Sequence, residues 1–192
     1  MNYSTAIAIL LAAIASAGNV GRQQARSDPC SRLHEATNAT FTLLNTFDPT
    51  DKKRVNEDIV ASLQALAQAA NDCNAYVALP GTKLSSSSGA IFNVVASSAE
   101  NIEMTRMEAF RLADACGVTR YYLFAARAAL LSLGKAIRYN LVSTGTNHDS
   151  AEEACQSMSV STRKLLDTLY SSQKCRDPFK LVPLLNFDRK FE

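Results

Sequence analysis

The stretch Thr119–Val142 reads TRYYLFAARAALLSLGKAIRYNLV, and every charge in it is basic. At about 100° per residue, its apolar side chains recur on one face of a helix. Further alanines and tyrosines extend the apolar surface around the helix, which is typical of a helix buried among other helices. We therefore expect this stretch to be the central helix of an all-α protein. The face consists of Leu123, Leu130, Gly134, Ile137 and Leu141.

The basic residues of the same stretch fall in a stripe about 80° wide on this geometry. One interpretation is a binding site for an acidic partner, such as an anionic protein surface, a sulfated glycan or a lipid head group. The alternative is that the stripe pairs with the acidic flank of the preceding helix, or is simply solvated. The stripe is Arg120, Arg127, Lys135 and Arg138, and the acidic flank is Glu100, Glu103 and Asp114.

The composition is that of one globular domain. The chain has 192 residues, of which 47% are hydrophobic and 20% charged, with few Gly and Pro. This length and apolar content are sufficient for a full-sized core. The net charge of +2 is too small to indicate binding to nucleic acid or to an anionic membrane.

The first residues predict a cleaved secretory signal peptide over residues 1–17. An apolar run, Ile7–Ile14, precedes the small residues Ala15-Ser16-Ala17, and this order matches a signal peptidase site. The polar segment 18–27 is predicted to be a flexible N-terminus. We therefore expect a secreted, extracellular protein, and Asn38-Ala39-Thr40 predicts N-glycosylation of Asn38.

Four other segments have helical periodicity. The predicted helices begin at Asp28-Pro29, before Val55, near Ser88 and at Ser150. The third is expected to run unbroken to Cys116, with Gly117 as its left-handed end. Short loops then predict an antiparallel up-down bundle of about five helices over residues 28–175. Residues 176–192 are predicted to form an extended apolar C-terminal tail on that bundle.

The five cysteines are expected to form disulfides, because secretion places them in an oxidising compartment. In an up-down bundle, Cys30 and Cys73 lie at one end and Cys116 and Cys175 at the other. The predicted bridges are therefore Cys30–Cys73 and Cys116–Cys175, with Cys73–Cys155 as a rival. In the preferred set Cys155 is left unpaired, or forms a disulfide-linked dimer.

No motif for catalysis, metal binding or a cofactor is evident. His34 and His148 are the only histidines, and each is interpreted as a plain surface or capping residue. We therefore expect a non-enzymatic protein without a cofactor or metal.

The remaining hypotheses concern binding. The first is an extracellular protein-binding effector or inhibitor, a choice that rests only on analogy with motif-poor helical proteins of saliva and venoms. The alternative is a carrier of a small apolar ligand, such as a fatty acid, in a pocket between helices. In that case Arg127 or Arg138 would hold a carboxylate at the mouth. The pocket would be lined by small residues at predicted buried positions, namely Ala70, Ser98, Thr105, Ala109, Ala129 and Ala136.

Overall fold

The computed structural model describes residues 28–84 and 86–171, which form helices and turns without any strand. The all-α class predicted from the sequence is confirmed. The predicted signal peptide (1–17), the segment 18–27, Cys175 and the tail 176–192 lie outside the described residues.

The first two helices follow their sequence signals closely. Helix α2 (Pro29–Thr46) begins where the Asp28 carboxylate accepts a hydrogen bond from the Cys30 N–H at 3.1 Å, an N-cap that satisfies one open donor. Helix α3 (Lys52–Val77) is the longest element before α6. All seven residues of its predicted apolar face are buried, namely Val55, Ile59, Leu63, Leu66, Ala70, Cys73 and Val77.

The predicted third helix is broken, which corrects the expectation of one helix over residues 88–116. Ser86–Gly89 forms a 3₁₀ turn, η2, followed by α4 (Ala90–Thr105) and a short α5 (Met107–Leu112). The break falls at Arg106, whose Nη2 donates to the Phe47 carbonyl at 2.6 Å and whose guanidinium lies over the Phe47 ring. The change of direction lets Phe110 pack edge-on against Phe47, and it leaves Leu112 exposed.

The turn after α5 is made by Asp114 rather than by the predicted Gly117. Asp114 has a φ of +53°, and it ion-pairs with Lys52 of α3. Its N–H bonds to the Arg111 carbonyl and the next N–H, of Ala115, to the Phe110 carbonyl, the two bonds of a Schellman turn. Helix α6 therefore begins earlier than expected, and its bounds are Cys116–Ser143.

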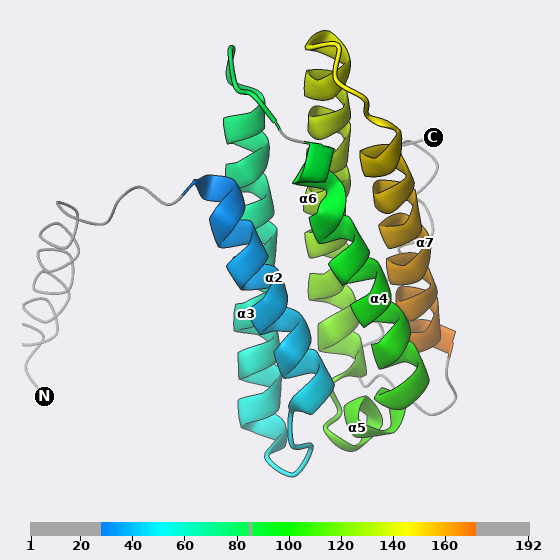
Figure 1. The fold of residues 1–192 in the computed structure, drawn as a ribbon. Helices are drawn as coiled ribbons and strands as arrows, with labels where there is room; N and C mark the ends of the chain where they lie inside the picture. The colour runs from blue at the N-terminus through cyan, green and yellow to red at the C-terminus, as the bar shows by residue number, and fades with distance from the viewer. Residues whose placement is uncertain (1–27, 85, 172–192) are drawn as a thin grey trace, which may run out of the picture.

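The helices pack in a ring, with α7 (Asp149–Ser171) between α6 and α4. In order around the ring, α2 contacts α3, α3 contacts α6, α6 contacts α7, α7 contacts α4, and α4 closes on α2. Consecutive long helices alternate in direction, as predicted (Figure 1). The ring nevertheless places α6 beside α3, which runs parallel to it, and separates α3 from its successor α4. One end of the bundle thus collects the start of α2, the ends of α3 and α6, and η2.

The Cys30–Cys73 disulfide forms at this end, as predicted, with a Cα–Cα distance of 4.7 Å. We call this end the disulfide end of the bundle. Cys116, at the opposite end, is also disulfide-bonded, and its predicted partner Cys175 lies outside the described residues. Cys155 is a free thiol, so the rival Cys73–Cys155 bridge is wrong.

Candidate functional site at the disulfide end

The basic stripe of α6 does not form an open patch, because it faces α7. Arg120 and Arg127 are buried, with only 7% and 9% of their surface exposed. The Arg120 guanidinium lies 4.8 Å from the centroid of the Tyr170 ring, and Arg127 Nη2 donates to Ser159 Oγ at 3.0 Å. The stripe therefore contributes to the packing of α6 on α7, while its predicted role in binding an acidic partner stays a prediction.

The remaining two residues of the stripe, Lys135 and Arg138, are exposed at the disulfide end of α6. Arg138 Nη1 lies 3.1 Å from Oε1 of Glu152, on α7. The acidic flank that was expected to pair with the stripe is engaged elsewhere, so that pairing is wrong. Glu100 accepts from Ser161, Glu103 pairs with Lys164, and Asp114 pairs with Lys52.

A cavity of about 310 Å³ opens at the disulfide end, between α2, α3, α4 and α6. Its volume lies at the lower limit of small-molecule sites. We call it the disulfide-end cavity. Its lining residues are Asp28, Cys30, Ser31, Leu33, His34, Cys73, Tyr76, Val77, Lys83, Leu84, Ser88, Ile91, Leu133 and Ile137.

The floor of the cavity is apolar and comes from all four helices. Each floor side chain is at most 3% exposed and carries only carbon beyond its backbone. A ligand atom that reaches this floor moves from water into a hydrocarbon surrounding. The free energy of that transfer is favourable for apolar groups and unfavourable for polar ones. The floor residues are Leu33, Val77, Ile91, Leu133 and Ile137.

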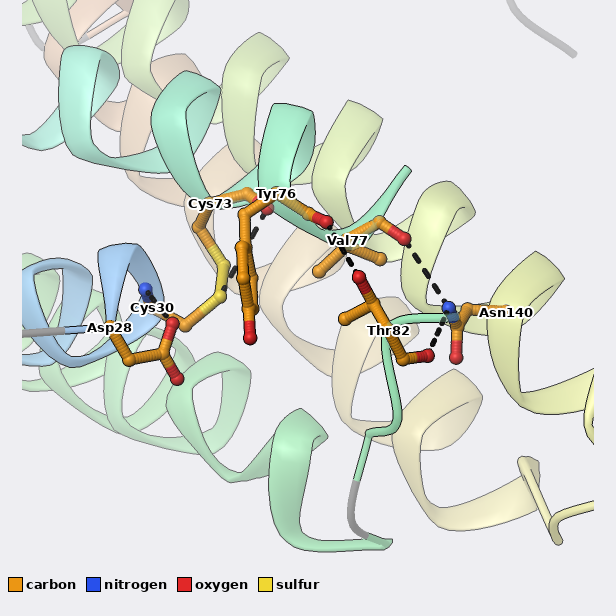
Figure 2. The surroundings of a disulfide bond; sticks show 7 residues. All are labelled: Asp28, Cys30, Cys73, Tyr76, Val77, Thr82 and Asn140. Carbon is orange, nitrogen blue, oxygen red and sulfur yellow. Dashed lines mark hydrogen bonds between the residues drawn. A yellow bond between two sulfur atoms is a disulfide. The ribbon is translucent and has the colours of Figure 1, made fainter. Parts of the chain in front are cut away.

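The rim of the cavity is polar. Asp28, Ser31, His34 and Lys83 are exposed there, and Tyr76 is half-buried. Figure 2 shows Asp28, the disulfide and Tyr76 together at the junction of α2 and α3. An apolar floor beneath a polar rim is the arrangement expected of a site for a small ligand with a polar end.

Lys83 and Leu84 line one side of the cavity, at the end of a segment, residues 78–84, that hydrogen bonds hold against α3 and α6. Gly81 has a φ of +81° and turns the chain back, after which Thr82 Oγ1 donates to the Tyr76 carbonyl at 3.1 Å. Asn140 of α6, which is 9% exposed, donates through Nδ2 to the carbonyls of Val77 and Thr82 at 3.3 and 3.1 Å (Figure 2). This amide therefore fixes the wall that presents Lys83 to the cavity.

The outer side of the same segment forms a second hollow, of about 510 Å³, which we call the loop groove. Tyr139, 78% exposed, and Leu79, 56% exposed, both line it. Exposed aromatic and aliphatic side chains beside a hollow are common at protein-binding surfaces. The remaining lining residues are Val77, Ala78, residues 80–83, Ala136, Asn140, Ser143 and Thr144.

The cavity differs from the pocket predicted from small residues. Of the predicted lining residues, Ala136 is the one that lines either of these two hollows, and it lines the loop groove. Arg127 and Arg138 do not line the disulfide-end cavity, so neither can hold a carboxylate at its mouth. His34, interpreted from the sequence as a plain surface residue, is the histidine that does line it. The sequence already indicates that His34 lies near the disulfide, because His34 follows Cys30 by four residues and therefore shares its helix face.

The other titratable groups do not assemble a reactive centre in the described part of the chain. His148 Nε2 lies 3.8 Å from Glu152 Oε2 on the first turn of α7. Burial raises the pKa of the Cys155 thiol, Glu152 raises it further, and Lys135 and Arg127 oppose the rise. Among residues 28–84 and 86–171, no three His, Cys, Asp or Glu side chains converge to hold a metal ion.

Comparison of the chain with protein-family models, with curated proteins and with solved structures finds no match. None of the helices in the described ranges is both long enough and apolar enough to cross a membrane.

Proposed function

We propose that the protein is a secreted, non-enzymatic binding protein whose disulfide-end cavity carries a small, mainly apolar ligand. The observation that supports this proposal is the cavity of about 310 Å³ with a wholly apolar floor and a polar rim. The Cys30–Cys73 disulfide supports an extracellular location, because such bridges persist in oxidising compartments.

The test is to block the mouth of the cavity in the full mature chain. Ser31 is exposed at the rim on α2, so Ser31→Trp places an indole across the opening. Ser97, exposed on α4 away from both hollows, provides the matched control Ser97→Trp. Binding of the small fluorescent apolar probe 1-naphthylamine, whose size matches the volume of the cavity, is then measured by titration.

The proposal predicts saturable binding of one probe per chain, weakened at least tenfold by Ser31→Trp and unchanged by Ser97→Trp. Equal binding by the two variants, or no saturable binding by the parent protein, would overturn it. Circular dichroism and the thermal midpoint confirm that both variants remain folded.

A second candidate function, binding of a protein partner as an effector or inhibitor, is favoured by the loop groove. Tyr139 and Leu79 offer two exposed anchors beside a hollow whose surface is mostly apolar. A photo-crosslinking residue at position 139 should give one discrete protein adduct in the native extracellular fluid. The same residue at the exposed Tyr121, near the opposite end of α6, should give none.

A further inference from the structure

We infer that the ligand of the disulfide-end cavity is an anionic amphiphile, with a carboxylate-type head group at Lys83 and an apolar tail on the floor. This inference rests on the proposed function and specifies the chemistry of the ligand. It is carried by the charge and hydrogen-bonding state of the rim, taken together with the apolar floor and the volume of the cavity.

Every polar side chain named at the rim except Asp28 can donate a hydrogen bond. Asp28, the only carboxylate among the described lining residues, already accepts the Cys30 N–H through Oδ1 at 3.1 Å, at a helix N-terminus that partly offsets its charge. Among the described residues, Lys83 makes no ion pair, and neither His34 nor the Tyr76 hydroxyl has a side-chain hydrogen bond. A head group that arrives at this rim therefore meets an ammonium group, an imidazole and a phenol, all of which can donate.

The position of Lys83 is defined by its neighbour. Thr82 is held through its hydroxyl by the Tyr76 carbonyl and through its own carbonyl by Asn140. The backbone that carries Lys83 is thus fixed at the mouth, while its long side chain stays exposed. A flexible ammonium group above a rigid wall can meet a carboxylate that projects from the cavity.

The floor sets the nature and the length of the tail. Because Leu33, Ile91 and Leu133 present only carbon, a polar group placed deep in the cavity would lose its hydrogen bonds to water. At roughly 30 Å³ for each water-sized atom, a cavity of about 310 Å³ accommodates roughly ten non-hydrogen atoms. A saturated chain of about ten carbons with a terminal carboxylate matches both the apolar floor and the volume of the cavity.

The experiment compares ligands that share one tail and differ in the head group. The full mature chain, stripped of bound lipid, is titrated with decanoate, decanol and decyltrimethylammonium by displacement of 1-naphthylamine. The variant is Lys83→Gln. The matched control is Lys53→Gln, which removes an exposed lysine near the far end of α3.

The inference predicts that decanoate binds most tightly. Lys83→Gln should weaken decanoate binding about fivefold, the effect of an exposed ion pair, and leave decanol binding unchanged. Lys53→Gln should leave both unchanged. Decanol or the cationic amphiphile binding as tightly as decanoate, or decanoate binding insensitive to Lys83→Gln, overturns the anionic head group while leaving the carrier function intact. Failure of all three ligands to displace the probe overturns the carrier function itself.

Discussion

Gly134 of α6 lies directly against Cys155 of α7, so close that a Cβ added to the glycine would overlap the cysteine Sγ. Phe92 of α4 closes the same space, with its Cζ 3.6 Å from the added atom. Glycine inside a helix costs about 0.5–1 kcal/mol relative to alanine. Here the close approach of α6 and α7 offsets that cost, and it also holds the exposed end of the basic stripe beside α7.

Gly134→Ala should therefore destabilise the protein, although alanine is the better helix former. We expect the free energy of unfolding to fall by about 1–3 kcal/mol, the typical cost of overpacking. Cys155→Ala removes the overlapping sulfur, so the double variant should be more stable than Gly134→Ala alone. Urea denaturation of the four proteins measures this coupling. Additive effects of the two substitutions would show that the two residues are not in contact.

Removal of the Cys30–Cys73 bridge should lower stability strongly. The bridge closes a loop with a sequence separation of 43 residues, and chain entropy assigns about 4 kcal/mol to a loop of that length. Replacing both cysteines by serine should lower the thermal midpoint by many degrees. Cys155→Ser, which leaves the bridge in place, is the control and should change the midpoint far less.

The Cys155 thiol should react slowly at neutral pH. Because burial and then Glu152 raise its pKa above the ordinary thiol value, the thiolate is scarce at pH 8. Alkylation by iodoacetamide should be slower than that of a free peptide thiol at pH 8, and should accelerate as the pH rises above 9. Glu152→Gln should accelerate it at pH 8, whereas the exposed neighbour Glu153→Gln should not.

The same pKa shift fixes the sign of one contribution to stability. A thiol with a raised pKa in the folded state stabilises that state below the unfolded pKa, and the contribution is lost as the pH rises through the folded pKa.

The slow reaction of the Cys155 thiolate also bears on the predicted disulfide-linked dimer through Cys155. We expect non-reducing electrophoresis to show mainly monomer, and a dominant covalent dimer would contradict the half-buried placement of Cys155.

Loss of the Asn140 amide should release the cavity wall. Asn140→Ala leaves the carbonyls of Val77 and Thr82 without their donor, at a cost of about 1–3 kcal/mol. Hydrogen exchange should accelerate in the segment 78–84, and probe binding should weaken. Tyr139→Ala, at the exposed neighbouring position, should change the free energy of unfolding by less than about 0.5 kcal/mol.

The sequence predicts the fold correctly where the spacing of apolar residues within one helix is enough to define the buried face of that helix. Every residue on the apolar face of α3 is buried, as its helical spacing indicates, and Asp28-Pro29 marks the start of α2. The break at Arg106 is not visible in the sequence, because its cause is a contact with Phe47, 59 residues earlier in the chain. Propensity and periodicity report local preferences, and tertiary contacts of this kind override them.

The candidate site is harder to predict for the same reason. No one helix forms the disulfide-end cavity, since its floor takes only one or two residues from each of four helices. The basic stripe on α6 can be recognised in the sequence because all of its residues lie on one helix. The sequence does not show that Arg120 and Arg127 are buried against α7. The predicted Cys30–Cys73 bridge is a long-range constraint, and it correctly placed the start of α2 beside the end of α3.

The most direct test of the central claim is a methyl NMR titration of the protein with decanoate. We expect saturable shifts at the floor methyl groups, with the exposed methyl groups of Val160 and Met104 unmoved. The floor methyl groups are those of Leu33, Val77, Ile91, Leu133 and Ile137. Shifts confined to the exposed methyl groups, or no saturable shift at the floor, would contradict a ligand in the disulfide-end cavity.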